Sequence, residues 1–359
     1  MSIPGSYHIP SNLSLELLRK IRDHRAQRST SMSRSFRVAT VQFQHRAGDK
    51  DHNLGRIEHF AEAAAAAGAQ IACLPEMCIS GYWHLPRLDR GGLYELAEPV
   101  DGPSVSRVAT LAENLGIGIG VGWLERDAHD RLYNAYRLCL PNGGGHTHRK
   151  LHAFEHPLIS SGQDYTVFDT PWGVRMSILI CWDNNLVENP RVAALRGAEV
   201  LLAPHQTGGT KSLSPKGMKH IPLRYWEERG QNPERLRREF QGPNGRGWLM
   251  RWLPARAHDN GLFIVFSNGV GRDEDELRTG NAMILDPYGD VLSESNSIGD
   301  DIVTADLDIE EVATSSGRRW MCGRRPNLYG SLAQRLGTEL SPHATRFGLS
   351  RVGDVEFPI

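Results

Sequence analysis

Apolar runs typical of β-strands alternate with helical segments over most of this chain. The β-prone runs begin at Phe36 and recur at 69–75, 134–140, 176–181, 199–204 and 262–268. Helices are predicted at about 53–67, 104–115, 186–196 and 225–240. Strands that alternate with helices in this way predict an α/β fold.

Three of the apolar runs lead to a residue that carries chemistry. The run 69–75 is followed by Glu76, because Pro75 fixes its own φ and ends the strand. The run 134–140 is followed by a Gly-rich turn and then by Lys150. The run from Met176 ends at Cys181, where a sharp strand-to-helix turn would expose the thiol and hold its backbone fixed.

Each of these residues has a structural interpretation when it is taken alone. Free cysteines usually pack in cores, and glutamates and lysines at loop ends are usually solvated. Together, however, a carboxylate, an ammonium and a thiol suit attack of the thiol on the carbon of a C–N bond. The carboxylate takes the thiol proton, and the ammonium stabilises the developing oxyanion. The set therefore predicts a hydrolase with a cysteine nucleophile.

The segments around these residues resemble the three signatures of the nitrilase superfamily of carbon–nitrogen hydrolases. The matching segments are Leu74-Pro75-Glu76, Arg149-Lys150-Leu151-His152 and Ile180-Cys181-Trp182-Asp183. The similarity continues through 194–201 and 255–268, and it covers about residues 35–310 in the order of the family. It implies the family's four-layer αββα sandwich, in which two sheets pack face to face with helices outside.

The resemblance also implies a role for each matched residue. Cys181 would be the nucleophile, Glu76 the general base and acid, and Lys150 the cation that stabilises the oxyanion. The backbone N–H of Trp182 would be a second oxyanion donor. A supporting glutamate often follows the lysine in the family, and Glu155 matches it; the alternative is an ordinary loop carboxylate. We expect both glutamates and the lysine to be buried together, with coupled titrations.

Tyr82, Trp182 and His205 are the candidates for contact with the substrate. His205 opens a long polar segment, 205–246, which is an insertion relative to most of the family. Long loops in compact domains are usually functional. We therefore expect this insertion to cover the pocket or to shape a subunit contact, with His205 or Trp226 touching the substrate.

The chain divides into three parts under this interpretation. An N-terminal arm covers residues 1–34, the carbon–nitrogen hydrolase domain covers 35–310, and a C-terminal tail covers 311–359. The arm contains a basic amphipathic pattern over 14–28, which predicts either a short helix or a partly disordered segment. Tails of this kind cross to a partner subunit in relatives, so the resemblance implies a homodimer or a larger homo-oligomer.

Composition narrows the classes of partner. The chain has 359 residues with 41 basic and 42 acidic side chains, so a formal charge of −1 suggests no affinity for nucleic acid or a membrane surface. No apolar stretch approaches the 18 or more residues of a membrane span. Five cysteines, an odd number, lie mostly in apolar runs with no secretory signal before them, which predicts reduced thiols in the cytoplasm.

No metal or cofactor is expected at this site. The histidines at 146, 148 and 152 have no matching ligand cluster, and Cys73 and Cys78 fit a core better than a zinc site. The lysine supplies the polarising charge that a metal would otherwise provide. The predicted partner is thus a small amide, ureido compound or nitrile.

The reaction type stays open among three alternatives. Trp182-Asp183 after the cysteine is similar to relatives that cleave simple amides or N-carbamoyl compounds, and we expect this activity with release of ammonia or an amine. True nitrilases more often carry Trp-Glu there, so a nitrilase is the first alternative. The second is a binding homologue without activity. An intact Glu76, Lys150 and Cys181 set argues against it, because burying charged groups costs several kcal/mol.

Overall fold

The computed structural model describes residues 34–348. The predicted arm before Arg34, including the possible helix at 14–28, lies outside the described residues. Within the described part no helix is long and apolar enough to cross a membrane.

The strands form a single hydrogen-bonded path that folds into two sheets. The path runs in the order β5 (Gly145–Arg149), β4 (Leu132–Cys139), β3 (Gly118–Arg126), β2 (Ile71–Cys73), β1 (Ser35–Phe43), β10 (Phe263–Asp273), β9 (Val200–His205), β8 (Arg175–Ile178) and β7 (Thr166–Asp169). The two halves join where β1 and β10 pair in parallel, at Gln42 with Asn268 and Phe43 with Gly269. This short junction lets one half turn back over the other.

The remaining strands extend these two halves. β14 (Asp301–Asp308) runs antiparallel to β1, and β12 (Met283–Leu285) runs antiparallel to β10. The shorter strands are β6 (Ile159–Ser160), β11 (Glu276–Thr279) and β13 (Val291–Glu294). At the far ends of the path, Thr166 Oγ1 of β7 donates to the carbonyl of Thr147 in β5 at 3.2 Å. The sandwich is therefore nearly closed.

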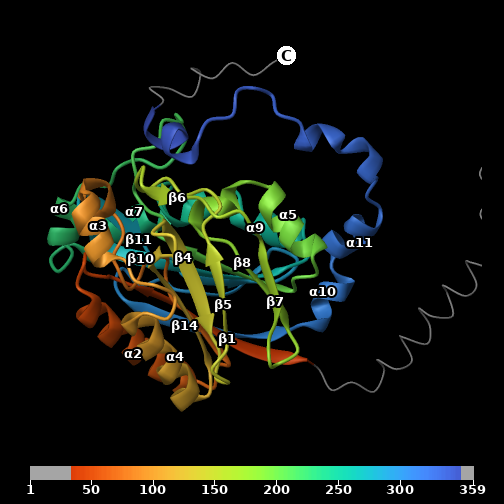
Figure 1. Cartoon of the computed structure of the whole chain (residues 1–359), viewed down its shortest axis with the longest axis horizontal. Coiled ribbons are helices and arrows are strands. Elements are labelled where there is room, and N and C mark those ends of the chain that lie inside the picture. Colours follow the sequence, from red (N-terminus) through yellow and green to blue (C-terminus); the bar gives the residue numbers. More distant parts are fainter. Residues whose placement is uncertain (1–33, 349–359) are drawn as a thin grey trace, which may run out of the picture.

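Alternating side chains of the central strands build a core on each face of the sheets. Val38 of β1 packs in one buried core with Ile178 of β8 and Val265 of β10, between the two halves. On the outer face of the first half, Val41 packs with α2 (Lys50–Ala66) and α4 (Pro103–Leu115). On the outer face of the second half, Leu201 packs with α5 (Glu188–Leu195) and α9 (Leu253–His258). The order helix, sheet, sheet, helix confirms the predicted αββα sandwich (Figure 1).

Two of the predicted helices have different bounds in the structure. The segment 225–240 is not one helix but two, α6 (Arg224–Glu227) and α7 (Pro233–Gln241). The break has a local cause, because the side chain of Asn232 caps α7 and Pro233 starts it, and proline is favoured in a first turn. The helix predicted at 186–196 is α5, which is preceded by a separate 3₁₀ turn, η2 (Cys181–Asn185).

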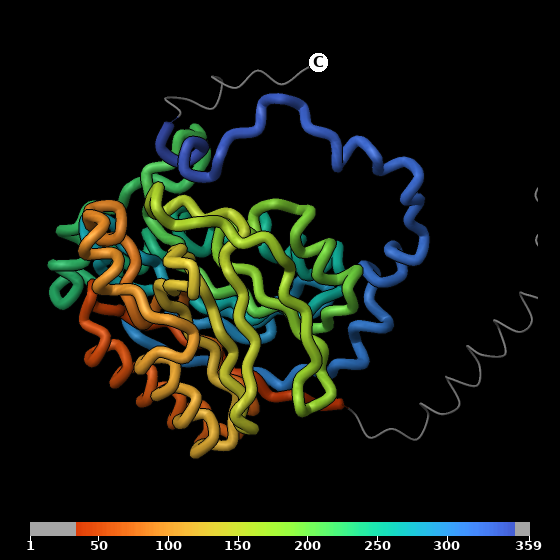
Figure 2. Tube along the Cα trace, in the orientation of Figure 1, coloured from red at the N-terminus to blue at the C-terminus, as the bar shows by residue number. Residues whose placement is uncertain are grey.

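The chain after β14 leaves the sandwich and returns to it. It forms α10 (Glu310–Thr314) and α11 (Ser316–Cys322) beside the second half, and then arches over one end of the molecule to the insertion (Figure 2). The short turns of this arch are η3 (Pro326–Leu328), η4 (Gly330–Ala333) and η5 (Ala344–Gly348). The elements not yet named are η1 (Leu85–Arg87), α3 (Arg90–Leu96) and α8 (Arg246–Leu249).

Candidate active site

The structure brings Glu76, Lys150 and Glu155 into direct contact. Lys150 Nζ donates to Glu76 Oε1 at 2.8 Å and to Glu155 Oε1 at 2.5 Å. Glu76 follows β2, and Lys150 follows β5, so strand ends of one sheet carry both groups. All three side chains are fully buried. An ammonium has three N–H donors, so one remains for a further acceptor after these two contacts.

Asn134, which the sequence analysis did not single out, holds the two carboxylates together. Its Nδ2 donates to Glu76 Oε1 at 2.7 Å and to Glu155 Oε1 at 2.9 Å. It is fully buried in β4. A buried amide inside an otherwise apolar strand needs hydrogen-bond partners, and that was the available signal in the sequence. Lys150 and Asn134 are thus two different donors that hold the carboxyl groups of Glu76 and Glu155 close to each other.

Burial and mutual charge shift the pKa values of these groups. Burial alone would lower the pKa of Lys150, but the charges of Glu155 and Glu76 raise it well above its ordinary value. Burial and a charge on Cys181 raise the pKa of Glu76 well above its ordinary value, although Lys150 acts in the opposite direction. Lys150 thus keeps its charge, and Glu76 is a carboxylate that readily holds a proton.

Cys181 lies at the start of η2 with a strained backbone. Its φ of 48° is in the left-handed region, which costs a residue other than glycine of the order of 1 kcal/mol. Met77, directly after Glu76, has a φ of 51°. Glu76 Oε2 has no hydrogen-bond partner among residues 34–348, and the backbone N–H of Trp182 makes none with them either. A free carboxylate oxygen and a free N–H therefore accompany the thiol.

Asp183 joins the cysteine turn to the loop after β5. Its carboxylate accepts from the backbone N–H of Ile180 at 3.1 Å, of Leu151 at 3.2 Å and of His152 at 2.9 Å. The His152 ring also contacts it at 2.9 Å, and His148 Nε2 lies 3.5 Å away. Although burial alone would raise the pKa of Asp183, these histidines lower it below its ordinary value. Asp183 therefore faces the protein and does not line the pocket.

His205 is fully buried behind the cysteine turn and does not line the pocket. Asn184 Nδ2 lies 3.1 Å from His205 Nε2 and also donates to the carbonyl of Leu179, which fixes its orientation. Burial lowers the pKa of His205 to about 3, so the ring is neutral. Its Nε2 then accepts from Asn184, and its Nδ1–H donates to Thr207 Oγ1 at 2.9 Å. Thr207 can in turn donate its own hydroxyl hydrogen to Cys181 Sγ, 3.8 Å away.

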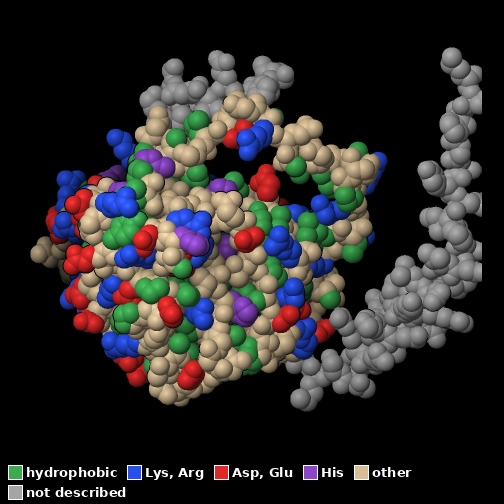
Figure 3. All heavy atoms as spheres, viewed as in Figure 1, with side chains coloured by type: hydrophobic (Ala, Val, Ile, Leu, Met, Phe, Trp, Pro, Cys, Tyr) green, Lys and Arg blue, Asp and Glu red, His purple; other side chains and the backbone are tan. Residues whose placement is uncertain are grey.

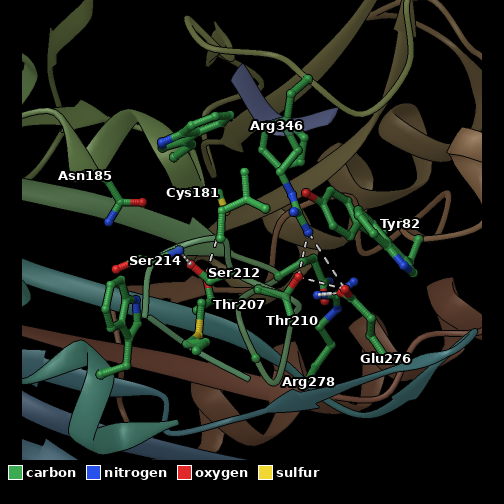
Figure 4. A pocket seen from close by; sticks show the side chains of 18 of the residues that line it. Tyr82, Cys181, Asn185, Thr207, Thr210, Ser212, Ser214, Glu276, Arg278 and Arg346 are labelled. Carbon is green, nitrogen blue, oxygen red and sulfur yellow. Dashed lines mark hydrogen bonds and ion pairs between the residues drawn. The ribbon is translucent and has the colours of Figure 1, made fainter. Parts of the chain in front are cut away.

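Cys181 opens onto a pocket of about 430 Å³ whose walls are rich in aromatic rings (Figure 4). Tyr82 and Trp182 line it, as do further aromatic side chains at Trp83, Phe154 and Trp248. The insertion contributes lining residues between Gln206 and Met218, but neither His205 nor Trp226, the two expected substrate contacts of the insertion, lines the pocket. Unexpectedly, Thr345 and Arg346 of the C-terminal tail complete the wall.

The histidines of the 146–152 segment contact other side chains. His148 and His152 both contact Asp183, and the His146 ring stacks on Phe168 with the ring centroids 4.1 Å apart. Among residues 34–348 there is no group of three histidine, cysteine or acidic side chains that could hold a metal ion.

Residues 37–315 match the family model described as carbon–nitrogen hydrolase, and the chain belongs to this family. This match confirms the predicted superfamily and makes the chain a carbon–nitrogen hydrolase enzyme.

Individual relatives agree with this class. A protein of Pseudomonas protegens described as "Hydrolase in pqqF 5'region" is 28% identical over 313 residues, covering 86% of this chain and 95% of that protein. An (R)-stereoselective amidase of a Pseudomonas species is 30% identical over 265 residues, covering 72% and 81%. A solved structure, a cysteine-to-alanine mutant of the Nesterenkonia AN1 amidase from the nitrilase superfamily, superposes with a TM-score of 0.61 at 20% identity, covering 84% and 97%.

Proposed function

We propose that this enzyme hydrolyses a small amide or N-carbamoyl compound through an acyl intermediate on Cys181. The observation that carries the proposal is the buried contact of Lys150 Nζ with Glu76, beside a cysteine that opens onto the pocket. Similarity to an (R)-stereoselective amidase supports the same reaction class.

The first half of the reaction forms the acyl-enzyme. Glu76 takes the proton of the Cys181 thiol, and the sulfur bonds to the carbonyl carbon of the substrate. The oxygen becomes negative and accepts hydrogen bonds from the third N–H of Lys150 and from the backbone N–H of Trp182. The C–N bond then breaks, and Glu76 gives its proton to the departing nitrogen.

The second half releases the acid. Water attacks the thioester carbon while Glu76 takes one of its protons, and the same two donors hold the oxyanion. The C–S bond breaks, and the proton on Glu76 returns to the sulfur. In sum, amide and water become carboxylic acid and ammonia or amine. The charge of Glu155 raises the pKa of Lys150 and so helps to keep the lysine protonated throughout.

The pocket wall supports a substrate with an apolar or flat acyl group. Tyr82 is buried and stacks on Trp83 with ring centroids 5.9 Å apart, and Trp182 meets Phe154 edge to face at 4.9 Å. Rings in this arrangement bind apolar groups with defined orientation. Tyr82 and Trp182 are therefore proposed as substrate contacts, whereas His205 is proposed to act through Thr207.

Ammonia release from a panel of primary amides, N-carbamoyl amines and nitriles tests this proposal. The wild type should release ammonia from members of the amide or N-carbamoyl group, and Cys181→Ala should release none while keeping the wild-type melting temperature. Cys322→Ala is the matched control, because Cys322 is exposed and far along the chain. Release from nitriles alone would replace the proposal with a nitrilase, and release by Cys181→Ala would overturn the nucleophile.

We also propose that the enzyme is a homo-oligomer that works in a reducing compartment such as the cytoplasm. The tail exposes a series of leucines, with Leu332 70%, Leu328 56% and Leu336 56% accessible. Exposed apolar patches mark interaction sites in many folded proteins, and these leucines support the proposed oligomer. Light scattering should give at least twice the mass of 40.0 kDa for the wild type and the single mass for a Leu332→Ser, Leu336→Ser variant. A wild-type mass equal to that of one chain would contradict the proposed homo-oligomer.

A further inference from the structure

One corner of the pocket holds four charged or polar side chains that the proposed chemistry does not use. Arg278 and Glu276 come from β11, Thr210 comes from the insertion, and Arg346 comes from the tail. Thr210 Oγ1 donates to Glu276 Oε1 at 2.7 Å and accepts from Arg346 Nη2 at 2.6 Å. Figure 4 shows these contacts together on the side of the pocket near Tyr82. We call this group the polar corner.

The arginine of the polar corner is buried and only partly satisfied. The Arg278 side chain is 3% exposed; its Nε donates to Asp273 Oδ2 at 2.9 Å, and its Nη1 lies 2.9 Å from Glu276 Oε2. Its Nη2 has no acceptor among residues 34–348, and Glu276 Oε2 has no hydrogen bond there. A buried donor without a partner costs about 1–3 kcal/mol. Within the described part of the chain, Arg278 Nη2 thus lacks an acceptor in the pocket wall, and beside it Glu276 Oε2 has the charge of Nη1 nearby but no hydrogen-bond donor.

The charge of the polar corner selects the kind of group that would fill it. Arg278 and Arg346 face Asp273 and Glu276, so two positive charges meet two negative ones. A carboxylate on the substrate would lose its hydration and find these arginines already paired with acids. A neutral group with one acceptor and one donor fits better, since a carbonyl accepts from Nη2 while an N–H donates to Oε2.

The polar corner lies one aromatic ring away from the catalytic lysine. The Tyr82 ring centroid is 5.9 Å from Lys150 Nζ and 5.1 Å from Arg278 Cζ. The Trp83 ring lies beside it, 5.3 Å from Arg278 Cζ and 5.6 Å from Arg346 Cζ. A short linker that crosses the Tyr82 ring would therefore place one end of a substrate at Cys181 and the other at the polar corner.

We propose that Arg278 and Glu276 bind a second amide group of the substrate, at the end remote from the bond that is cleaved. This inference rests on the proposed amidase function and narrows its substrate class to compounds with two amide-like groups. Arg346 and Thr210 act by holding Glu276 in place, and they are positioning residues for the subsite.

The test uses linear primary amides of matched length that differ only at the far end. The far end is an N-methylcarboxamide, a methyl ester, a carboxylate or a branched alkyl group, and the linker is varied over two to six methylenes. Ammonia release gives kcat/KM for each. The ratio between two substrates within one protein is independent of the folded fraction, so a partly misfolded variant still gives a valid result. The variants are Arg278→Lys and Glu276→Gln, with the exposed Arg272→Lys as control.

In the wild type we expect the N-methylcarboxamide substrate to exceed the alkyl one in kcat/KM by about tenfold or more, because a site built to form hydrogen bonds rejects a substrate that lacks them. Arg278→Lys should bring this ratio towards one, and Arg272→Lys should leave it unchanged. Glu276→Gln should remove the preference for the N-methylcarboxamide over the ester.

Three results would overturn the subsite: equal rates for the alkyl and amide ends in the wild type, a preference for the carboxylate end, or an unchanged ratio in Arg278→Lys. Failure of the proposed function has a different signature, because none of the substrates would then release ammonia.

Discussion

Asp183 accepts a hydrogen bond of 2.9 Å from the backbone N–H of His152, two residues after Lys150. The same carboxylate holds the backbone before Cys181. Asp183 therefore fixes the distance between Lys150 and Cys181, although its side chain contacts neither of them. The acid after Trp182 therefore lies outside the lining of the pocket.

Asp183→Asn tests this role. Its amide can place only one oxygen towards three backbone N–H groups, so at least one buried donor loses its acceptor at a cost of about 1–3 kcal/mol. We expect a lower melting temperature and a fall in kcat of about tenfold or more. Asp169→Asn is the control, since that carboxylate is 73% exposed. Equal kcat values for Asp183→Asn and the wild type would show that the link is not needed.

Lys150→Met should abolish turnover and also destabilise the fold. It leaves Glu76 and Glu155 buried without their cation, and breaking a buried ion pair in this way costs about 3–5 kcal/mol. Chemical denaturation measures this loss. The double variant Lys150→Met, Glu155→Gln should recover part of the stability but none of the activity. If the single variant were as stable as the wild type, the buried contacts of Lys150 with Glu76 and Glu155 would contribute nothing to the stability of the fold.

Asn134→Leu removes the amide between the two carboxylates while keeping a similar volume. Both acids lose a buried donor, so we expect a fall in kcat of about tenfold or more and a smaller change in KM. Steady-state kinetics separates the two. Asn142→Leu, in the exposed turn after β4, is the control. A change confined to KM would assign Asn134 to substrate binding instead.

The buried neutral His205 makes stability depend on pH. Its pKa falls from 6.5 to about 3 on folding, so the unfolded chain binds one more proton between these values. Its contribution to stability is complete above pH 6.5 and is lost as the pH falls towards 3. In His205→Gln we expect the unfolding free energy to fall less steeply as the pH is lowered, by the slope that corresponds to about one proton. His129→Gln, on an exposed loop, should leave this slope unchanged. An identical acid profile for His205→Gln would contradict this.

Thr207→Val should slow alkylation of Cys181 by iodoacetamide. The substitution keeps the shape of the side chain but removes the hydroxyl that His205 directs towards the sulfur. A hydrogen bond to an anion contributes about 1.5–3 kcal/mol, so we expect a fall of roughly tenfold in the alkylation rate at neutral pH. Thr207→Ser should restore it. A Val variant as reactive as the wild type would remove Thr207 from the mechanism.

The layers of the fold and the Glu76, Lys150 and Cys181 set were predictable because each depends on a local pattern. The strand before Cys181 is read from its apolar run, and the turn after it from the polar residues that follow. Asn134 was harder to find, since an amide within a strand gives no sign of the two carboxylates that it will meet across the sheet.

The walls of the pocket were not predictable from local patterns. Arg346 reaches Thr210 from 136 positions away in the chain, and no periodicity encodes such a contact. His205 comes directly after the predicted strand 199–204 and therefore looks like a substrate contact, but in the structure it is the last residue of β9 and is buried. Trp226 packs with Leu236 and Phe240 in a small core of the insertion. This large side chain therefore fills a core and does not contact the pocket.

Because Thr345 and Arg346 follow Cys181 by 164 and 165 positions, the ribosome makes Glu76, Lys150 and Cys181 long before it makes this wall of the pocket. A nascent chain, or one cleaved by a protease between η4 and η5, would hold Glu76, Lys150 and Cys181 in place while one wall of the pocket is missing. Such a shortened enzyme would be expected to keep its chemistry and to lose its discrimination among substrates.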